Sequence, residues 1–269
     1  MTDLLSERSV IPPDGADEEV RGVMTEPTLR IDRTETAVEV MLDRPSARNA
    51  INQAMIDELH TVCDELERQP HVLIVSGAGG VFASGADIAE LRGRRAADAL
   101  SGINTGLFQR IADLPMPVIA ALDGYALGGG AELAYAADFR IASPSLRIGN
   151  PETSLGIIAA AGASWRLREL VGEPLAKEIL LAGRILTADE ALAAHLVTEL
   201  HPADRLLGAA RALAGRILRG DPAALRATKR VFAAARSEHP RVDLDEQAVL
   251  FESPEKTARM TAFLERKRS

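Results

Sequence analysis

Two glutamates stand in surroundings that suggest acid–base chemistry. Glu132 lies in LGGGAELAYAAD (127–138), where alanines and leucines surround it and burial of its carboxylate is expected. Glu152 follows Pro151 in GNPETSLGI, a loop that leaves an expected strand. Two carboxylates near one water can serve as acid and base, because burial and mutual repulsion separate their pKa values. The spacing alone does not bring them together, and Glu132 also suits a structural role, since the helix dipole favours a carboxylate in a first turn.

Three consecutive glycines, 128–130, open the expected helix that carries Glu132. The first turn of a helix exposes unpaired N–H groups, and a glycine there lets a ligand reach the backbone without meeting a Cβ. The loop FASGAD (82–87) offers a second turn of this kind. N–H groups from the two turns can converge on one oxygen as an oxyanion hole, where the loss of one donor costs about 3 kcal/mol of barrier. Tight packing of the helix against a strand is the alternative explanation for the glycines.

The elements that must position these residues alternate between strands and helices. The expected strands are TLRIDR (28–33) and VEVMLDR (38–44), which form a hairpin, followed by VLIVSG (72–77), PVIAALDG (117–124), FRIASP (139–144) and SLRIGN (145–150). Apolar residues at helical spacing predict helices over about 51–70 and 101–114. From about Trp165 onward the pattern is almost purely helical. This order indicates an α/β fold with a helical appendage.

Composition and charge disfavour several classes of function. The net charge of −8 argues against nucleic-acid binding, which normally needs a basic face. Cys63 is the only cysteine, so neither an internal disulfide nor a cysteine metal cluster is expected, which fits a reducing cytoplasm. The five histidines show no metal-ligand spacing, and no apolar run reaches the length of a membrane span. Residues 1–26 are acidic and broken by prolines, which predicts a poorly ordered tail and no secretory signal.

Three motifs, FASGADIAEL, PVIAALDGYALGGGAELAYAAD and IGNPETSLGI, resemble in their order and spacing the crotonase superfamily of enoyl-CoA hydratases and isomerases. The resemblance runs from about Thr28 to the C-terminus. It implies a spiral of repeated ββα units over 27–200, which holds the catalytic and coenzyme A sites. It also implies a C-terminal helical trimerisation domain over 201–269 and a setting in fatty-acid metabolism such as β-oxidation.

Residue by residue, the resemblance assigns a hydratase site. The N–H groups of Ala86 and Gly129 would hold the acyl-thioester oxygen. Glu132 and Glu152 match the two catalytic glutamates of hydratases. Neither a metal nor a redox cofactor is implied, because the oxyanion hole carries the enolate charge and coenzyme A is part of the substrate.

The resemblance also assigns contacts to the substrate. Arg48 lies where the family often places a basic side chain near the coenzyme A phosphates, and Phe108 lies on the helix that walls the acyl pocket. The implied substrate and coenzyme A contacts are Arg48, Ala86, Asp87, Ile88, Ala89, Phe108 and Gly129. The implied assembly is a homo-oligomer, either a trimer or a dimer of trimers. Apolar residues of the C-terminal helices that a monomer would expose agree with it: Val249, Leu250, Phe251, Met260 and Phe263.

The sequence departs from the family after Glu152. GIIAAAGASWRL (156–167) stands where the family usually reads something like GIIPGAGGTQRL, so Ala159 replaces a proline and Ala160 a glycine. A serine and a tryptophan, 164–165, replace a Thr–Gln pair, and the substrate range is left open by these changes. The leading interpretation is an enoyl-CoA hydratase that adds water across the 2,3 double bond of a 2-enoyl-CoA. The alternatives are an isomerase of the same family, which often needs only the acid matching Glu152, and a non-catalytic acyl-CoA-binding protein.

Overall fold

Six strands form the main sheet, in the order β1-β2-β3-β4-β6-β9. The computed structural model describes residues 27–266, so the tail predicted over 1–26 lies outside the described residues. β1 (Leu29–Arg33) and β2 (Ala37–Leu42) pair antiparallel, which confirms the predicted hairpin. The strands that follow pair in parallel: β3 (Val72–Gly77), β4 (Val118–Leu122), β6 (Phe139–Ala142) and β9 (Glu199–Leu200).

A second, smaller sheet places the two glutamate-bearing segments side by side. It contains β5 (Tyr125–Leu127), β7 (Arg147–Gly149) and β8 (Leu186–Thr187). β5 follows β4 and leads into helix α5, while β7 follows β6, so the chain passes between the sheets in strand–strand–helix units. β5 and β7 are parallel neighbours, with Leu127 opposite Gly149. Because parallel strands end at the same edge, the segments that leave these two strands emerge together.

The main hydrophobic core lies between the two sheets and the helices that surround them. Its helices include α1 (Gln53–Arg68), α4 (Ile103–Ala112), α5 (Gly129–Ala136), α6 (Ala163–Val171), α7 (Glu173–Ala182) and α8 (Ala188–Ala193). The short helices α2 (Ile88–Gly93) and α3 (Ala96–Ser101) precede α4. The helix predicted over 101–114 corresponds to α4, which Gly102 separates from α3, because its φ of 67° belongs to the left-handed region that ends helices. Buried residues of α1 recur at helical spacing, as predicted.

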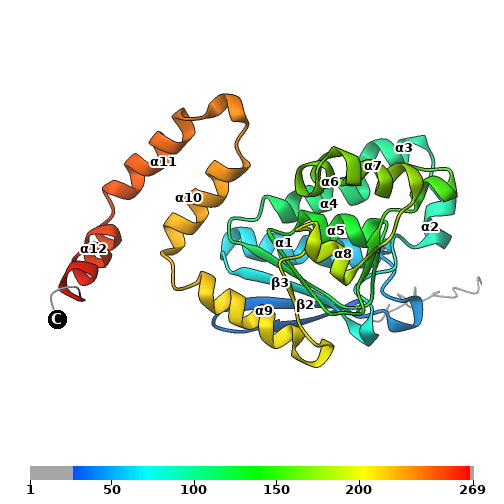
Figure 1. The fold of residues 1–269 in the computed structure, drawn as a ribbon, viewed down its shortest axis with the longest axis horizontal. Helices are drawn as coiled ribbons and strands as arrows, with labels where there is room; N and C mark the ends of the chain where they lie inside the picture. Colours follow the sequence, from blue (N-terminus) through cyan, green and yellow to red (C-terminus); the bar gives the residue numbers. More distant parts are fainter. Residues whose placement is uncertain (1–26, 267–269) are drawn as a thin grey trace, which may run out of the picture.

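A second core lies on the opposite face of the main sheet, where α9 (Ala203–Ile217) packs across β3, β4 and β6 (Figure 1). Residues of β3 alternate between the two cores: Leu73 and Val75 face one, while Val72 and Ile74 face the other. Both faces of this strand are therefore covered, which explains its continuous apolar sequence. The division predicted at residue 200 stays a prediction, and α9, which follows it, packs on the sheet.

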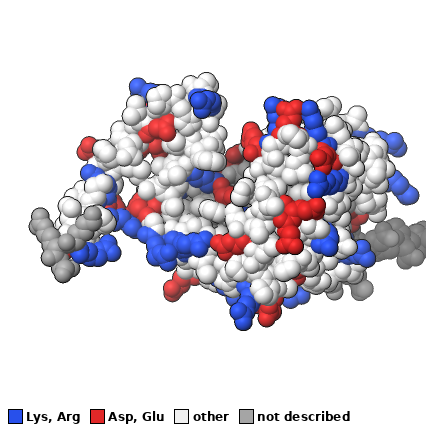
Figure 2. Space-filling view, in the orientation of Figure 1, with Lys and Arg blue, Asp and Glu red and all other residues white. Residues whose placement is uncertain are grey.

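The last three helices extend from the rest of the molecule, and the first of them contacts it through Leu225, which packs against the second core, and through Lys229 Nζ, which donates to Asp138 Oδ2 (2.7 Å). We call α10 (Pro222–Ala233), α11 (Arg241–Phe251) and α12 (Pro254–Arg266) the C-terminal arm (Figure 1). Ala227 is the one described residue of these helices that is buried. Figure 2 shows acidic and basic side chains interspersed over the core in this view, and stretches of uncharged surface on the arm. Among the described residues, no helix combines the length and the apolar character needed to cross a membrane.

The almost purely helical pattern predicted after Trp165 is interrupted by β8 and β9. Each is two residues long. β9 completes the main sheet beside β6, and β8 pairs antiparallel with β7 in the second sheet. Two residues are too few to produce an alternating pattern, so these strands follow from their neighbours in space rather than from their own sequence.

Candidate active site

A cavity of about 830 Å³ opens where the ends of β5 and β7 meet α2, α3 and α4. Its wall includes four of the residues to which the sequence assigned chemistry: Ala86, Gly129, Glu132 and Glu152. Spacing alone left open whether the two glutamates meet, and the parallel pairing of β5 with β7 brings them to one cavity.

Ala86 and Gly129, whose N–H groups were predicted to hold the thioester oxygen, both line the cavity. Two hydrogen bonds on either side of Ala86, from Ile51 N to Gly85 O (2.8 Å) and from Asp87 N to Ile51 O (2.9 Å), turn its own N–H away from Ile51. Gly129 is the first residue of α5, so no helical acceptor serves its N–H. Neither N–H has a hydrogen-bond acceptor among the described residues. A Cβ at residue 129 would stand 3.5 Å from the Ala86 nitrogen, so these two residues are neighbours on the cavity wall.

The three glycines serve different purposes. Gly128 has φ 52° and ψ −125°, and a Cβ there would lie 3.3 Å from Glu152 Oε1. A Cβ at Gly129 would make only ordinary contacts, the nearest at 3.5 Å from the Ala86 nitrogen. A Cβ at Gly130 would lie 2.4 Å from the Ala83 carbonyl oxygen, so this position needs glycine for packing. Tight packing, one of the two explanations considered from the sequence, therefore applies to Gly130, while ligand access at Gly129 stays a prediction.

Glu132 is buried in the first turn of α5, with 4% of its surface exposed. Its Oε1 accepts hydrogen bonds from the backbone N–H groups of Ala161 (2.7 Å) and Ala163 (3.1 Å). Burial raises the pKa of Glu132 to about 7, and the nearby charge of Glu152 adds to this rise, while the two N–H groups oppose it. Removal from water therefore outweighs the stabilisation that a helix N-terminus gives to a carboxylate.

Glu152 begins the 3-10 turn Glu152–Leu155, and its carboxylate is also buried. Its Oε1 accepts a hydrogen bond from Asn150 Nδ2 (3.2 Å), and its buried Oε2 has no partner among the described residues. Burial raises the pKa of Glu152 above its usual range. The Asn150 amide is itself held, since its Oδ1 accepts from Tyr135 OH (3.0 Å) and its Nδ2 lies 3.4 Å from Gly128 O.

Sequence analysis did not identify Asn150 and Tyr135 as supports for Glu152. The sequence did contain a signal for Asn150, because it is a polar residue at the end of an apolar strand, directly before Pro151. A second set of polar residues was also missed: Arg94 and Asn104, which line the cavity from the end of α2 and from α4.

Other residues predicted to contact the substrate lie in different surroundings. Ile88 lines the cavity, whereas Asp87 and Ala89 are not among its lining residues. Asp87 instead caps α2, because its Oδ1 accepts from Ala89 N (3.1 Å), and its Oδ2 pairs with Arg44 Nη1 (3.1 Å). The carboxylate therefore organises the backbone that carries Ala86 rather than facing the cavity.

Arg48 and Phe108 also differ from the other predicted contacts. Arg48 is exposed, has a left-handed backbone (φ 51°) and is not among the lining residues of the cavity. Phe108 is fully buried in the main core. Helix α4 does wall the cavity, through Ile103, Asn104 and Thr105, and Phe108 is not among the lining residues. The first turn of α4 therefore faces the cavity, and the rest of the helix does not line it.

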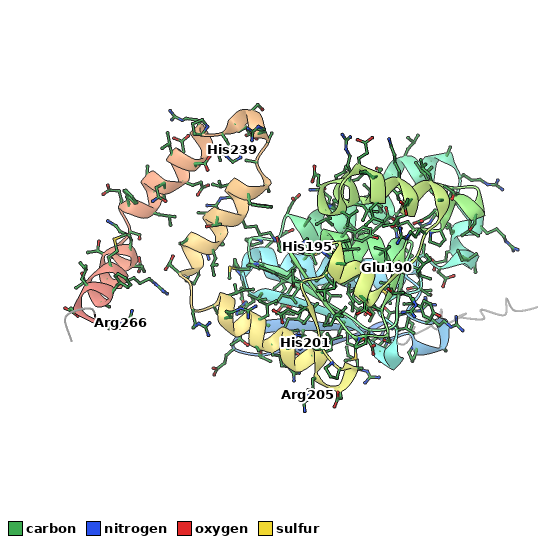
Figure 3. The ribbon with its side chains drawn as sticks, viewed as in Figure 1. Glu190, His195, His201, Arg205, His239 and Arg266 are labelled. Carbon is green, nitrogen blue, oxygen red and sulfur yellow. The ribbon has the colours of Figure 1, made fainter. Side chains whose placement is uncertain are left out.

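Within residues 27–266, no group of three or more His, Cys, Asp or Glu side chains is arranged to hold a metal ion. Figure 3 shows His195, His201 and His239 on separate parts of the chain. The cavity therefore offers backbone N–H groups and buried carboxylates as its reactive groups. This arrangement can stabilise negative charge on a bound oxygen while the carboxylates exchange protons with adjacent atoms.

Comparison with known proteins gives consistent matches along the chain. A family model described as enoyl-CoA hydratase/isomerase matches residues 32–269. A crotonyl-CoA hydratase of Syntrophomonas wolfei is 34% identical over 252 residues, which cover 89% of this chain and 95% of that protein. A 2,3-dehydroadipyl-CoA hydratase of Escherichia coli is 35% identical over 228 residues, with coverage of 83% and 88%. The crystal structure of an enoyl-CoA hydratase from Bacillus anthracis has a TM-score of 0.84 and 30% identity, with coverage of 89% and 96%.

Proposed function

The chain belongs to the enoyl-CoA hydratase/isomerase family, and we propose that it adds water across the 2,3 double bond of a 2-enoyl-CoA. The predicted crotonase fold is confirmed by its similarity to solved hydratases. The observation that carries the proposal is the placement of two buried carboxylates and two unpaired backbone N–H groups on one cavity wall.

In the proposed reaction, the thioester carbonyl oxygen accepts hydrogen bonds from the N–H groups of Ala86 and Gly129. As water attacks C3, the electrons of the double bond move toward this oxygen, and the two donors stabilise the enolate. One such donor is worth about 3 kcal/mol of barrier. The reaction needs no redox cofactor, because no electrons are gained or lost overall, and in this proposal the two N–H groups polarise the carbonyl in place of a metal.

We assign the two proton transfers to the two glutamates. Glu132 Oε1 is occupied by two backbone N–H groups, whereas Oε2 has no partner among the described residues and is assigned to the water. A pKa of about 7 lets this carboxylate accept a proton at neutral pH. Glu152, whose pKa burial also raises, carries the proton that is delivered to C2. Exchange with solvent then returns both glutamates to their starting states.

An absorbance assay at the enoyl-thioester band tests the proposal directly. Crotonyl-CoA and longer or branched 2-enoyl-CoAs should lose absorbance in the presence of the protein. A double-bond isomerase would instead convert 3-enoyl-CoA to 2-enoyl-CoA and leave hydration absent. The presence of Glu132 on the cavity wall supports the hydratase, because the resemblance gives isomerases only the acid that matches Glu152. Binding of CoA esters with neither reaction would support the non-catalytic alternative.

We also propose a homo-oligomer built on trimers and a cytoplasmic location. The C-terminal arm exposes large apolar side chains, including Phe232 (90% exposed) and Val249 (72%). Isolated exposed apolar residues are ordinary, but a group of them on three helices is characteristic of an interface. The cytoplasmic location is supported by the single cysteine, Cys63, which is buried. Light scattering that gave a stable monomer at micromolar concentration would contradict the oligomer.

A further inference from the structure

The cavity wall carries a cation that the proposed hydration does not use. Arg94 follows α2 and lines the cavity with its side chain half-buried. We propose that Arg94 binds a carboxylate at the far end of the acyl chain, so that the preferred substrate is a short 2-enoyl-CoA with a terminal carboxylate. This inference rests on the proposed function for the reaction, but the binding preference is measurable without turnover.

Among the described residues, Arg94 has no carboxylate as a bonded partner. Its Nη1 donates a hydrogen bond to Asn104 Oδ1 (3.0 Å), and no described Asp or Glu forms an ion pair with it. Charged groups that are partly removed from water are normally paired, because a neutral amide oxygen offsets only part of the lost hydration. A carboxylate fits a guanidinium well, since it accepts two parallel N–H···O hydrogen bonds. The missing partner is therefore best supplied by the ligand.

Two other charged residues on the wall have different settings. Arg95 also lines the cavity, but it is exposed to solvent and therefore gains less from an anion. Asp98 lines the cavity as well, and its Oδ2 accepts a hydrogen bond from the Arg95 backbone N–H (2.7 Å). Asp98 is thus held by α3, and no ion pair joins it to Arg94 within the described residues.

The position of Asn104 limits the length of the acyl chain. Its Nδ2 lies 3.7 Å from where a Cβ on Gly129 would stand, next to the two N–H groups assigned to the thioester oxygen. Its Oδ1 holds Arg94, so a single amide side chain spans the distance between the oxyanion site and the guanidinium. A carboxylate that reaches Arg94 from a thioester held at Gly129 must therefore sit on a chain of only a few carbons. Apolar residues that line the same cavity, such as Ile103 and Leu91, suit the methylene groups of that chain.

The phosphates of coenzyme A are a second source of anionic oxygens, and the test separates the two. Adipyl-CoA and hexanoyl-CoA differ only in that a carboxylate replaces the terminal methyl group. Their Kd values for the full-length protein, measured by calorimetry, are compared with those for Arg94→Gln. Arg92→Gln is the matched control, because Arg92 lies two residues before Arg94, in the last turn of α2, is exposed and is not a cavity-lining residue.

We expect the wild type to bind adipyl-CoA more tightly than hexanoyl-CoA. Arg94→Gln should weaken adipyl-CoA binding about tenfold or more, as for a lost charged hydrogen-bonded pair, and change hexanoyl-CoA binding less than twofold. Arg92→Gln should change neither. An equal loss for both ligands in Arg94→Gln would assign the arginine to coenzyme A phosphates and overturn the proposal, as would a wild type without a preference. These binding results do not depend on turnover. The proposal for Arg94 can therefore be tested even if the protein does not catalyse hydration.

Discussion

Helix α5 and the C-terminal arm present opposite relations between a helix and its surroundings. All eight residues of α5 are buried, while α11 and α12 bury none of their described residues. A helix that is covered on every side is fixed by the same chain, so α5 can hold Gly129 and Glu132 in a defined geometry. The arm has apolar side chains without cover, so its geometry depends on what it meets. The proposed catalysis and the proposed assembly thus depend on different parts of one chain.

The largest effect on activity is expected from changing the two buried carboxylates, one of which lies on α5. Glu132→Gln keeps the size of the side chain and its acceptor for Ala161 and Ala163, but removes its basicity. Hydration should fall about 10²-fold or more, the scale of a lost general base. Glu152→Gln should also abolish hydration and, in addition, stop exchange of the α-proton with solvent. A Glu132→Gln enzyme that hydrates at the wild-type rate would contradict the assignment.

Stability should change in the opposite direction to activity in Glu132→Gln. The folded state raises the pKa of Glu132 from 4.5 to about 7, so it binds the proton more tightly than the unfolded chain. The contribution of this group to stability is therefore fully present below about pH 4.5 and is lost as pH rises through about 7. At pH 8 the glutamine variant should be more stable by up to about 3 kcal/mol. A purely dipole-stabilising glutamate predicts a loss of about 0.3–1 kcal/mol instead. Urea unfolding at pH 5 and pH 8 separates the two.

An arginine that contacts the end of α5 should contribute more to stability than an arginine on the C-terminal arm. Arg140 is buried and donates to the carbonyl oxygens of Leu196 (2.8 Å) and Ala137 (2.5 Å), the latter at the C-terminal end of α5. Arg230, on the arm, pairs with Glu246 in solvent. Arg140→Met should lower the free energy of unfolding by about 2–3 kcal/mol, because buried carbonyl groups lose their donors. Arg230→Met should lower it by less than about 1 kcal/mol. If denaturant unfolding gave equal losses of unfolding free energy for the two variants, the predicted difference between the two regions would be wrong.

The smallest effect on folding is expected from the arm. Phe232→Ser replaces a side chain that is 90% exposed in the single chain, so the free energy of unfolding of the monomer should change by less than about 0.5 kcal/mol. Its oligomer should nevertheless dissociate at higher concentration than the wild type in sedimentation experiments. Leu100→Ser is the control, because Leu100 is 88% exposed on α3, outside the arm. If both substitutions caused the same dissociation, the proposal that the arm forms the interface would be wrong.

Elements with a clear period were predictable from the sequence, whereas features that depend on distant neighbours were not. The hairpin β1–β2 and helix α1 have alternating and helical patterns of their own, and they form as predicted. The two-residue strands β8 and β9 have no pattern and exist only because β7 and β6 lie beside them. The same distinction holds in the cavity. Glu132 and Glu152 stand in recognisable motifs, but the proximity of Asn104 to Gly129 arises from packing between α4 and α5.

The hydrogen bonds that orient Glu132 have a consequence for how this sequence can evolve. They come from the main chain of residues 161 and 163, in the segment where alanines replace the proline and glycine usual in the family. A backbone N–H survives almost any substitution of its own residue, so mutational drift in this segment does not remove the donors. Thr105 Oγ1 also braces the segment by donating to the Ala160 carbonyl oxygen (3.1 Å). Substrate preference can therefore diverge through these side chains while the inherited catalytic geometry is retained.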